Sequence, residues 1–156
     1  IISLTTRPKK ETEKDGWDYY FVNHKAFANA VRGHRRLEYT EFNGYYYGTP
    51  AEHVEFLTAM GKNVLISIEA QGVGQIRIKH PDNKAFFLVP TSLDELEKQI
   101  RQRYHADESG INLRMNKAKT ELELANIFGT CVPLTSDEEA FNAIKTELLE
   151  ELKNRE

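Results

Sequence analysis

The first half of the chain contains side chains that can bind an anion. Arg7 offers a planar guanidinium that can hold two phosphate oxygens, and Lys10 offers a single positive charge. Tyr19 and Tyr47 can donate a phenolic hydrogen bond to a phosphate oxygen without adding charge. The alternative for Arg7 and Lys10 is a solvated charged loop, which spacing alone favours. The alternative for the tyrosines is packing across a hairpin.

Glu38 lies in a β-rich stretch with apolar and aromatic neighbours. One carboxylate can accept both donors of a guanine edge, the ring N–H and the exocyclic amine, and Thr49 could donate to the guanine carbonyl oxygen. The alternatives are an exposed strand residue for Glu38 and a helix N-cap for Thr49.

Two further groups of polar residues follow. Glu69 comes directly after a short apolar run, where it could contact a ligand or a metal-bound water or lie at the surface, with neither interpretation favoured. Arg101, Arg103 and Arg114 flank the polar stretch 104–112 and could clamp a transferring phosphate; a solvated helix face is the alternative.

The elements that position the first of these groups can be predicted locally. Residues 1–6 and 17–22 read as extended segments, and Asn23 is a candidate N-cap for a helix that ends at Gly33. Asn43-Gly44 predicts a tight hairpin between strands 37–42 and 45–48. A capping box at 49–52, with proline at the first helical position, predicts a helix that closes at Gly61.

From there strands and helices alternate, which is typical of a parallel sheet covered on both faces. The predicted strands are 63–68, buried on both faces, then 85–89 and 130–132. Helices are predicted from residue 71 through 78, from Ser92 to about residue 103, from Asp107 or Ser109 to residue 128, and after Ser136. The first third is therefore an α+β unit and the remainder is α/β.

Composition excludes several classes of protein. The 156 residues carry a formal net charge of −3, which gives no support for general nucleic-acid binding. The longest apolar runs are far shorter than the ~20 residues of a membrane helix. Cys131 is the single cysteine, so no intrachain disulfide can form and a reducing, cytoplasmic location is expected. The five histidines do not have the spacing of metal ligands, so no protein-bound metal site is predicted.

Because the sequence begins without methionine, we expect it to be part of a longer chain.

Taken in order, these stretches resemble the guanylate kinase family. The blocks that carry the resemblance are TTRP at 5–8, DYYF at 18–21, LEY at 37–39, NGYYYGT at 43–49, GKNVL at 61–65, QG at 71–72 and PTSLDEL at 90–96. The resemblance implies a P-loop nucleoside monophosphate kinase of the α/β class: a parallel-sheet core, an inserted α+β GMP-binding subdomain and a helical lid. It places the GMP-binding subdomain at 3–49, the core at 50–103 and 118–156, and the lid at 104–117.

The implied reaction is ATP + GMP giving ADP + GDP, with Mg²⁺ and without nucleic-acid or membrane partners, in a monomer or homodimer. The residues that fall on the family's GMP-binding positions are Ser3, Arg7, Lys10, Glu13, Tyr19, Glu38, Tyr47, Thr49, Ser67 and Glu69. Arg103 and Arg114 fall on lid arginines that contact the phosphates and are the predicted catalytic residues.

The chain departs from the family pattern in several places. The glycine-rich phosphate loop that precedes the TTRP block in the family is not within this sequence, and we expect it upstream. Ser67 stands where the family usually has aspartate, Lys10 and Thr12 replace an arginine and a glycine, Gln99 replaces a basic lid residue, and Leu134 occupies an asparagine position near the adenine. These departures leave an alternative function open, a catalytically inactive guanylate-kinase-like module that binds phosphorylated or acidic partners.

Overall fold

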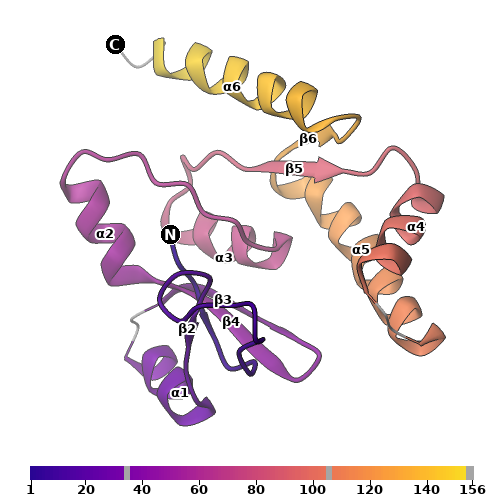
Figure 1. Cartoon of the computed structure of the whole chain (residues 1–156). Helices are drawn as coiled ribbons and strands as arrows, with labels where there is room; N and C mark the ends of the chain where they lie inside the picture. The colour runs from indigo at the N-terminus through magenta and orange to yellow at the C-terminus, as the bar shows by residue number, and fades with distance from the viewer. Residues whose placement is uncertain (34–35, 105–106, 154–156) are drawn as a thin grey trace. The chain divides into compact units, whose positions relative to one another are not determined.

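The computed structural model describes residues 1–33, 36–104 and 107–153. These residues form two compact units, Ile1–Asn83 and Lys84–Glu156, each of which is described by itself. Positions 105 and 106 of the predicted lid and positions 154–156 of the predicted core lie outside the described residues. The fold is mixed α/β, as predicted, and Figure 1 labels its helices and strands.

The first unit is built on a four-stranded sheet in the order β2-β1-β4-β3. Its strands are β1 (Leu4–Thr5), β2 (Tyr20–Phe21), β3 (Arg36–Phe42) and β4 (Tyr45–Pro50). β3 and β4 form the predicted hairpin, and its turn residues Asn43 and Gly44 have φ of 52° and 76°, which confirms the Asn-Gly turn. β1 pairs antiparallel to β4 and parallel to β2. β2 is shorter than the predicted 17–22, because Trp17 lies in a turn and is 75% exposed.

Helix α1 (His24–Arg32) covers one face of the hairpin. The Asn23 side chain accepts a hydrogen bond from the Ala26 amide at 2.8 Å, which confirms the predicted N-cap. Phe27 is buried and stacks on Tyr46, with ring centroids 5.5 Å apart, and also meets the edge of Tyr39. These aromatic contacts occupy one face of the sheet and leave the other face to polar residues.

Helices α2 (Ala51–Ala59) and α3 (Ala70–Lys79) both contact β3 in the first unit. Leu37, Ala51, Val54 and Ile76 form the buried cluster that joins them. The predicted capping box at Thr49 is wrong. The N-cap position of α2 is Pro50, without a side-chain cap, because the Thr49 hydroxyl instead donates to a carboxylate in β3.

The predicted strand at 63–68 is not formed. This segment pairs with neither sheet of the described residues, and it is not buried on both faces, since Leu65 is 85% exposed. Val64, Ile66 and Ile68 pack against the Leu37 cluster. The extended backbone therefore places alternate side chains on the core and on the surface, which its continuous apolar sequence does not indicate.

The second unit contains a parallel pair, β5 (Phe86–Val89) and β6 (Thr130–Pro133), with α4 (Leu93–Arg103), α5 (Glu108–Phe128) and α6 (Asp137–Lys153). Ser92 caps α4 and Asp107, rather than Ser109, caps α5, with hydrogen bonds of 3.1 and 2.8 Å. The Glu139 amide donates to the Ser136 hydroxyl, as predicted. Ile100 and Ile111 pack α4 against α5. β5 was expected to be fully buried, but Leu88 is 55% exposed.

None of the described helices is long and apolar enough to cross a membrane.

Candidate functional site

One face of the first unit's sheet carries three of the predicted binding residues, Glu38, Tyr47 and Thr49. Thr49 lies opposite Glu38 across the hairpin, and Tyr47 lies opposite Thr5 on β1. Because side chains two residues apart on a strand share a face, Tyr47, Thr49, Glu38 and Thr5 point to the same side, away from α1. The register shift between Arg36 and Glu38 breaks the alternation of β3, so that Leu37 and Glu38 are both buried.

Glu38 and Thr49 form a buried polar pair. Glu38 is 3% exposed and Thr49 is fully buried, and the threonine hydroxyl donates to Glu38 Oε1 at 2.6 Å. Burial raises the pKa of Glu38; the hydrogen bonds from Thr49 oppose that rise, and the charge of Glu69 adds to it. The prediction that Glu38 is more than an exposed strand residue is supported by this burial, because a carboxylate is costly to remove from water unless donors meet it.

Helix α3 fixes the place of the Glu38 carboxylate. A Cβ atom on Gly72 would lie 2.6 Å from Glu38 Oε2 and 3.1 Å from its Cδ, so only glycine allows this approach. One turn later, the Gln75 amide donates to the Tyr39 carbonyl at 2.6 Å and accepts from the Tyr39 N–H at 3.1 Å. Gln75 thus pairs with the outer edge of β3 as a neighbouring strand would. These two hydrogen bonds hold helix α3 close to β3.

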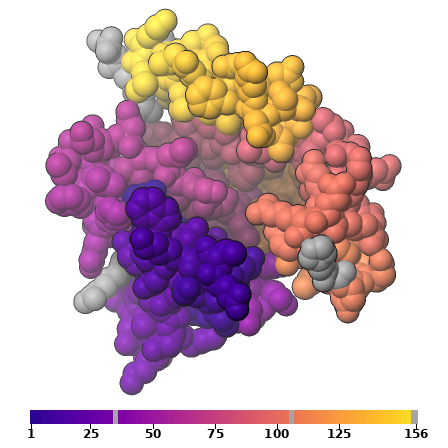
Figure 2. All heavy atoms as spheres, in the orientation of Figure 1, coloured from indigo at the N-terminus to yellow at the C-terminus, as the bar shows by residue number. Residues whose placement is uncertain are grey.

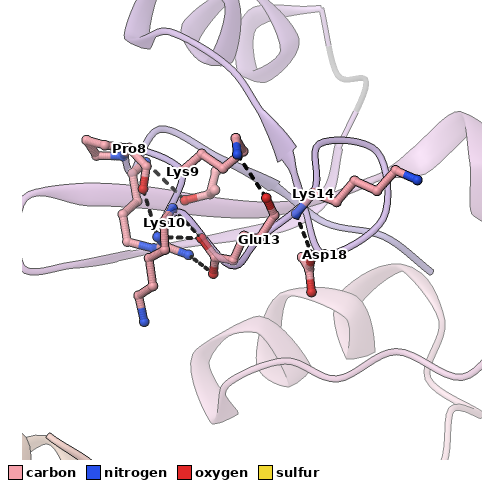
Figure 3. Close-up of polar contacts among 8 residues, drawn as sticks. Pro8, Lys9, Lys10, Glu13, Lys14 and Asp18 are labelled. Carbon is pink, nitrogen blue, oxygen red and sulfur yellow. Dashed lines mark hydrogen bonds and ion pairs between the residues drawn. The ribbon is translucent and has the colours of Figure 1, made fainter.

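The loop after β1 holds Arg7 in one orientation. Arg7 Nη2 lies 2.7 Å from Glu13 Oε1, and Nη1 donates to Glu13 Oε2 at 3.0 Å and to the Pro8 carbonyl at 2.8 Å. The Lys10 amide donates to the same carboxylate at 2.8 Å, and Lys9 Nζ donates to the Glu13 carbonyl (Figure 3). The hydrogen bond from Arg7, followed by that from the Lys10 amide, lowers the pKa of Glu13 to about 2.

This pairing uses the Nη1–Nη2 edge of the guanidinium. A guanidinium also presents a second bidentate edge, formed by Nε and Nη2, whose spacing suits a carboxylate or phosphate. The Arg7 guanidinium carbon lies 5.6 Å from the Tyr19 ring centroid and 5.7 Å from that of Phe21. Glu13 and the two rings therefore orient the cation, and the Tyr47 hydroxyl also interacts with it.

Tyr19 connects the two ends of the site. Its ring meets Tyr47 edge-on, with centroids 6.0 Å apart. Burial is the main cause that raises the pKa of Tyr19; the charge of Arg7 lowers it, and that of Glu69 raises it. The charge of Glu69, at the N-cap position of α3, also raises the pKa of Glu38. Figure 2 shows the N-terminal segment at the surface of this unit.

Ser3, Ser67 and Lys10, which were also predicted to bind GMP, have fewer contacts with the residues described above. The backbone carbonyl of Ser3 accepts a hydrogen bond from the Tyr20 amide, and the Ser67 side chain is exposed. No side-chain hydrogen bond between either serine and the residues above occurs in the part of the chain that the structure describes. Lys10 is exposed and is tied to the site through its backbone amide.

The two predicted lid arginines belong to the second unit. The guanidinium carbon of Arg114 lies 3.6 Å from the centroid of the Tyr104 ring, and that of Arg103 lies 5.5 Å from it. Arg101 is engaged by carboxylates instead, since it pairs with Glu97 at 2.7 Å and Glu108 at 2.6 Å.

Sequence reasoning did not identify Gly72 and Gln75 as parts of the site. The Gln-Gly dipeptide at 71–72 was a visible signal, but it indicates a helix start and not a close approach to a carboxylate 34 positions earlier. The Arg7–Glu13 pair was also not predicted, although both residues fall on GMP-binding positions of the family.

Comparison with known proteins places this geometry in context. A family model described as guanylate kinase matches residues 1–152. The chain is 39% identical to the guanylate kinase of Thermosynechococcus vestitus over 145 residues, which covers 93% of this chain and 76% of that protein. It is 38% identical to the guanylate kinase of Bacillus cereus over 155 residues, covering 99% and 76%. The crystal structure of guanylate kinase from Anaplasma phagocytophilum matches with a TM-score of 0.81 at 25% identity, over 96% of this chain and 73% of that one.

Proposed function

The chain belongs to the guanylate kinase family, and from this premise we propose that it acts in the transfer of the terminal phosphoryl group of ATP to GMP, giving ADP and GDP. The observation that carries the proposal is a buried, threonine-held carboxylate on one sheet face, together with an oriented guanidinium in the loop after β1. The first group suits a purine edge and the second suits a phosphate.

The Glu38 carboxylate favours guanine over adenine. Guanine presents a ring N–H and an exocyclic amine side by side, both of which a carboxylate accepts, whereas adenine presents a ring acceptor that the carboxylate repels. Burial strengthens this discrimination, because a wrong base leaves a charged group desolvated and without donors. Thr49 fixes the direction of the carboxylate and can contribute to the same recognition.

Arg7, Tyr19 and Tyr47 are the proposed partners of the GMP phosphate. Arg7 is oriented by Glu13 and by the rings of Tyr19 and Phe21, so less side-chain entropy is lost when the phosphate binds. The Tyr47 phenol lies close enough to Arg7 to help raise its pKa, which places a neutral donor beside the cation. We retain Ser3, Lys10, Glu13, Ser67 and Glu69 as proposed members of the GMP site.

ATP is the proposed phosphoryl donor, and Arg103 and Arg114 are the proposed catalytic residues that stabilise the transferring group. Within the described residues there is no group of three or more metal-ligating side chains. We propose that Mg²⁺ is bound mainly by phosphates and water, with Glu69 as the proposed contact to a metal-bound water. When bound, Mg²⁺ supplies charge neutralisation at the phosphates.

The second candidate function is the inactive binding module, and the exposed Ser67 in place of the family's usual aspartate favours it. A module that binds acidic peptides has no use for a buried carboxylate that accepts donors, and Glu38 would oppose such a ligand by its charge. Retention of the Glu38–Thr49 pair therefore makes the kinase the better supported function.

The test is a coupled ADP-release assay on the full-length protein, with GMP, dGMP, AMP and UMP as acceptors. We expect turnover with GMP and at most weak turnover with AMP and UMP. Turnover with AMP in preference to GMP would overturn the assignment of Glu38 as the base reader. Absence of turnover with every acceptor, together with binding of a phosphopeptide, would establish the module instead.

The three-part division at residues 3–49, 50–103 with 118–156, and 104–117 remains our prediction, as do a cytoplasmic location and a monomeric or homodimeric state.

A further inference from the structure

Tyr104 occupies the C-cap position of α4, three positions before Asp107, the N-cap of α5. Its amide donates to the Ile100 carbonyl at 2.9 Å, which anchors its backbone to the last helical turn. Its ring packs against the cluster formed by Ile100, Ile111 and Met115, which joins the two helices. Both anchors restrict the ring, so anything that rests on it is also restricted.

Two guanidinium groups rest on this ring. Arg114 Cζ is 3.6 Å from the ring centroid, a distance at which the cation is in direct contact with the aromatic face, and Arg103 Cζ is 5.5 Å away. Arg114 comes from α5 and Arg103 from α4, so the ring brings together two cations that are eleven positions apart in the chain.

An aromatic partner holds an arginine differently from a carboxylate. A stack uses the face of the guanidinium, whereas phosphate oxygens bind at its edge, so both contacts can exist together. Arg101 gives the contrast within the same unit, because the carboxylates of Glu97 and Glu108 take its edges at 2.6 to 2.9 Å. That pairing neutralises the Arg101 charge, whereas contact with an uncharged ring leaves the charge of a guanidinium unchanged.

We infer that Tyr104 is a positioning residue for phosphoryl transfer, whose ring presets Arg103 and Arg114 to converge on one phosphoryl group. The inference rests on the proposed function, in which these two arginines stabilise the transferring phosphate. Tyr104 itself is not a catalytic residue, since it acts through the cations that it supports. The ring face carries the effect and the phenolic hydroxyl does not.

The experiment compares Tyr104→Leu with Tyr104→Phe in the full-length protein. Leucine keeps apolar packing against Ile100 and Ile111 but removes the aromatic face, and phenylalanine keeps that face. We expect Tyr104→Leu to lower kcat by about tenfold with the KM for GMP changed less than about twofold, because the lost contact acts on the transition state. Tyr104→Phe should retain the kcat of the unaltered protein.

Leu96→Ala is the structural control, because Leu96 packs on the same cluster without contacting either arginine through a ring. At a temperature well below the melting point of every variant, it should keep kcat while lowering Tm. A direct readout is the Nε–Hε NMR resonance of Arg114, which the ring current shifts in the unaltered protein and in Tyr104→Phe, and which should lose that shift in Tyr104→Leu.

The outcomes separate the two proposals. If the unaltered protein phosphorylates GMP and Tyr104→Leu matches it in kcat, the positioning role is refuted while the kinase function stands. If Tyr104→Phe loses kcat as Tyr104→Leu does, the ring face is not the cause and the inference is overturned. If the unaltered protein phosphorylates no acceptor, the proposed function fails and the positioning role fails with it.

Discussion

Gly72→Ala tests the contact between helix α3 and the base-reading carboxylate. The added methyl group would lie 2.6 Å from Glu38 Oε2, well inside van der Waals contact. Glu38 cannot move freely, because it is buried and its other oxygen accepts from Thr49 at 2.6 Å. The helix cannot easily retreat either, because Gln75 is bonded twice to Tyr39.

The expected effect on stability is small, since two contributions oppose each other. Alanine gains about 1 kcal/mol over glycine in a helix. Overpacking costs about 1–3 kcal/mol when a buried neighbour must shift. The free energy of unfolding should therefore fall by no more than about 2 kcal/mol, a difference small enough to leave the protein folded at assay temperature.

The expected effect on GMP binding is larger. A displaced Glu38 carboxylate loses one of its two hydrogen bonds to the base, and one such charged hydrogen bond is worth about 1.5 kcal/mol, or roughly a tenfold rise in Kd. Calorimetry with GMP measures Kd, and the coupled ADP assay should give a matching rise in KM with little change in kcat, because the base is remote from the transferring group.

Gly74→Ala is the matched control. It makes the same chemical change in the same helix, but two residues correspond to about 200° of rotation, so its methyl group faces away from Glu38. It should stabilise the protein and leave GMP affinity unaltered. If Gly72→Ala also gains stability and binds GMP as tightly as the unaltered protein, the claim that α3 fixes the carboxylate is refuted.

Three other perturbations have expected outcomes. Tyr47→Phe removes the neutral donor beside Arg7 and should raise the KM for GMP about 3- to 10-fold, whereas Tyr46→Phe, on the α1 side of the strand, should not; equal effects would contradict the assignment of faces. Glu13 has its pKa held at about 2 against an ordinary 4.5, so the stability that it contributes is complete above pH 4.5 and is lost as the pH falls toward 2. Glu13→Gln should flatten that part of the curve of unfolding free energy against pH in urea titrations, and an unchanged slope would rule out the Arg7 pair. Asn23→Ala removes the N-cap of α1 and should cost about 1 kcal/mol in thermal unfolding with no change in the KM for GMP.

Local chemistry was enough to predict much of the fold. The Asn43-Gly44 turn, the Asn23 cap and the Ser92 cap depend on residues within three positions of one another, and all three are confirmed. Thr49 shows the limit of this reasoning. Its sequence neighbours indicate a helix cap, but its hydroxyl donates to Glu38, eleven positions away, because the hairpin register brings the two side chains together.

The burial of individual side chains was also not predicted by the local sequence pattern. Leu65 belongs to an apolar run that predicts a strand buried on both faces, yet it is exposed, because burial depends on which elements cover a segment. Glu38 is the opposite case, since a charged residue in a strand ordinarily faces water, and here the register shift and helix α3 enclose it.

The sequence by itself determined the secondary-structure elements other than the predicted strand at 63–68, the guanylate kinase family and the residue types that can meet a purine and a phosphate. Only the tertiary structure decided how these side chains are used: that Glu13 holds Arg7, that Gly72 and Gln75 fix Glu38, and that Tyr104 supports two arginines. The physical reason is that hydrogen bonds, ring contacts and desolvation act through space over a few ångströms, and the groups that make them can be 36 positions apart in the chain, as Tyr39 and Gln75 are.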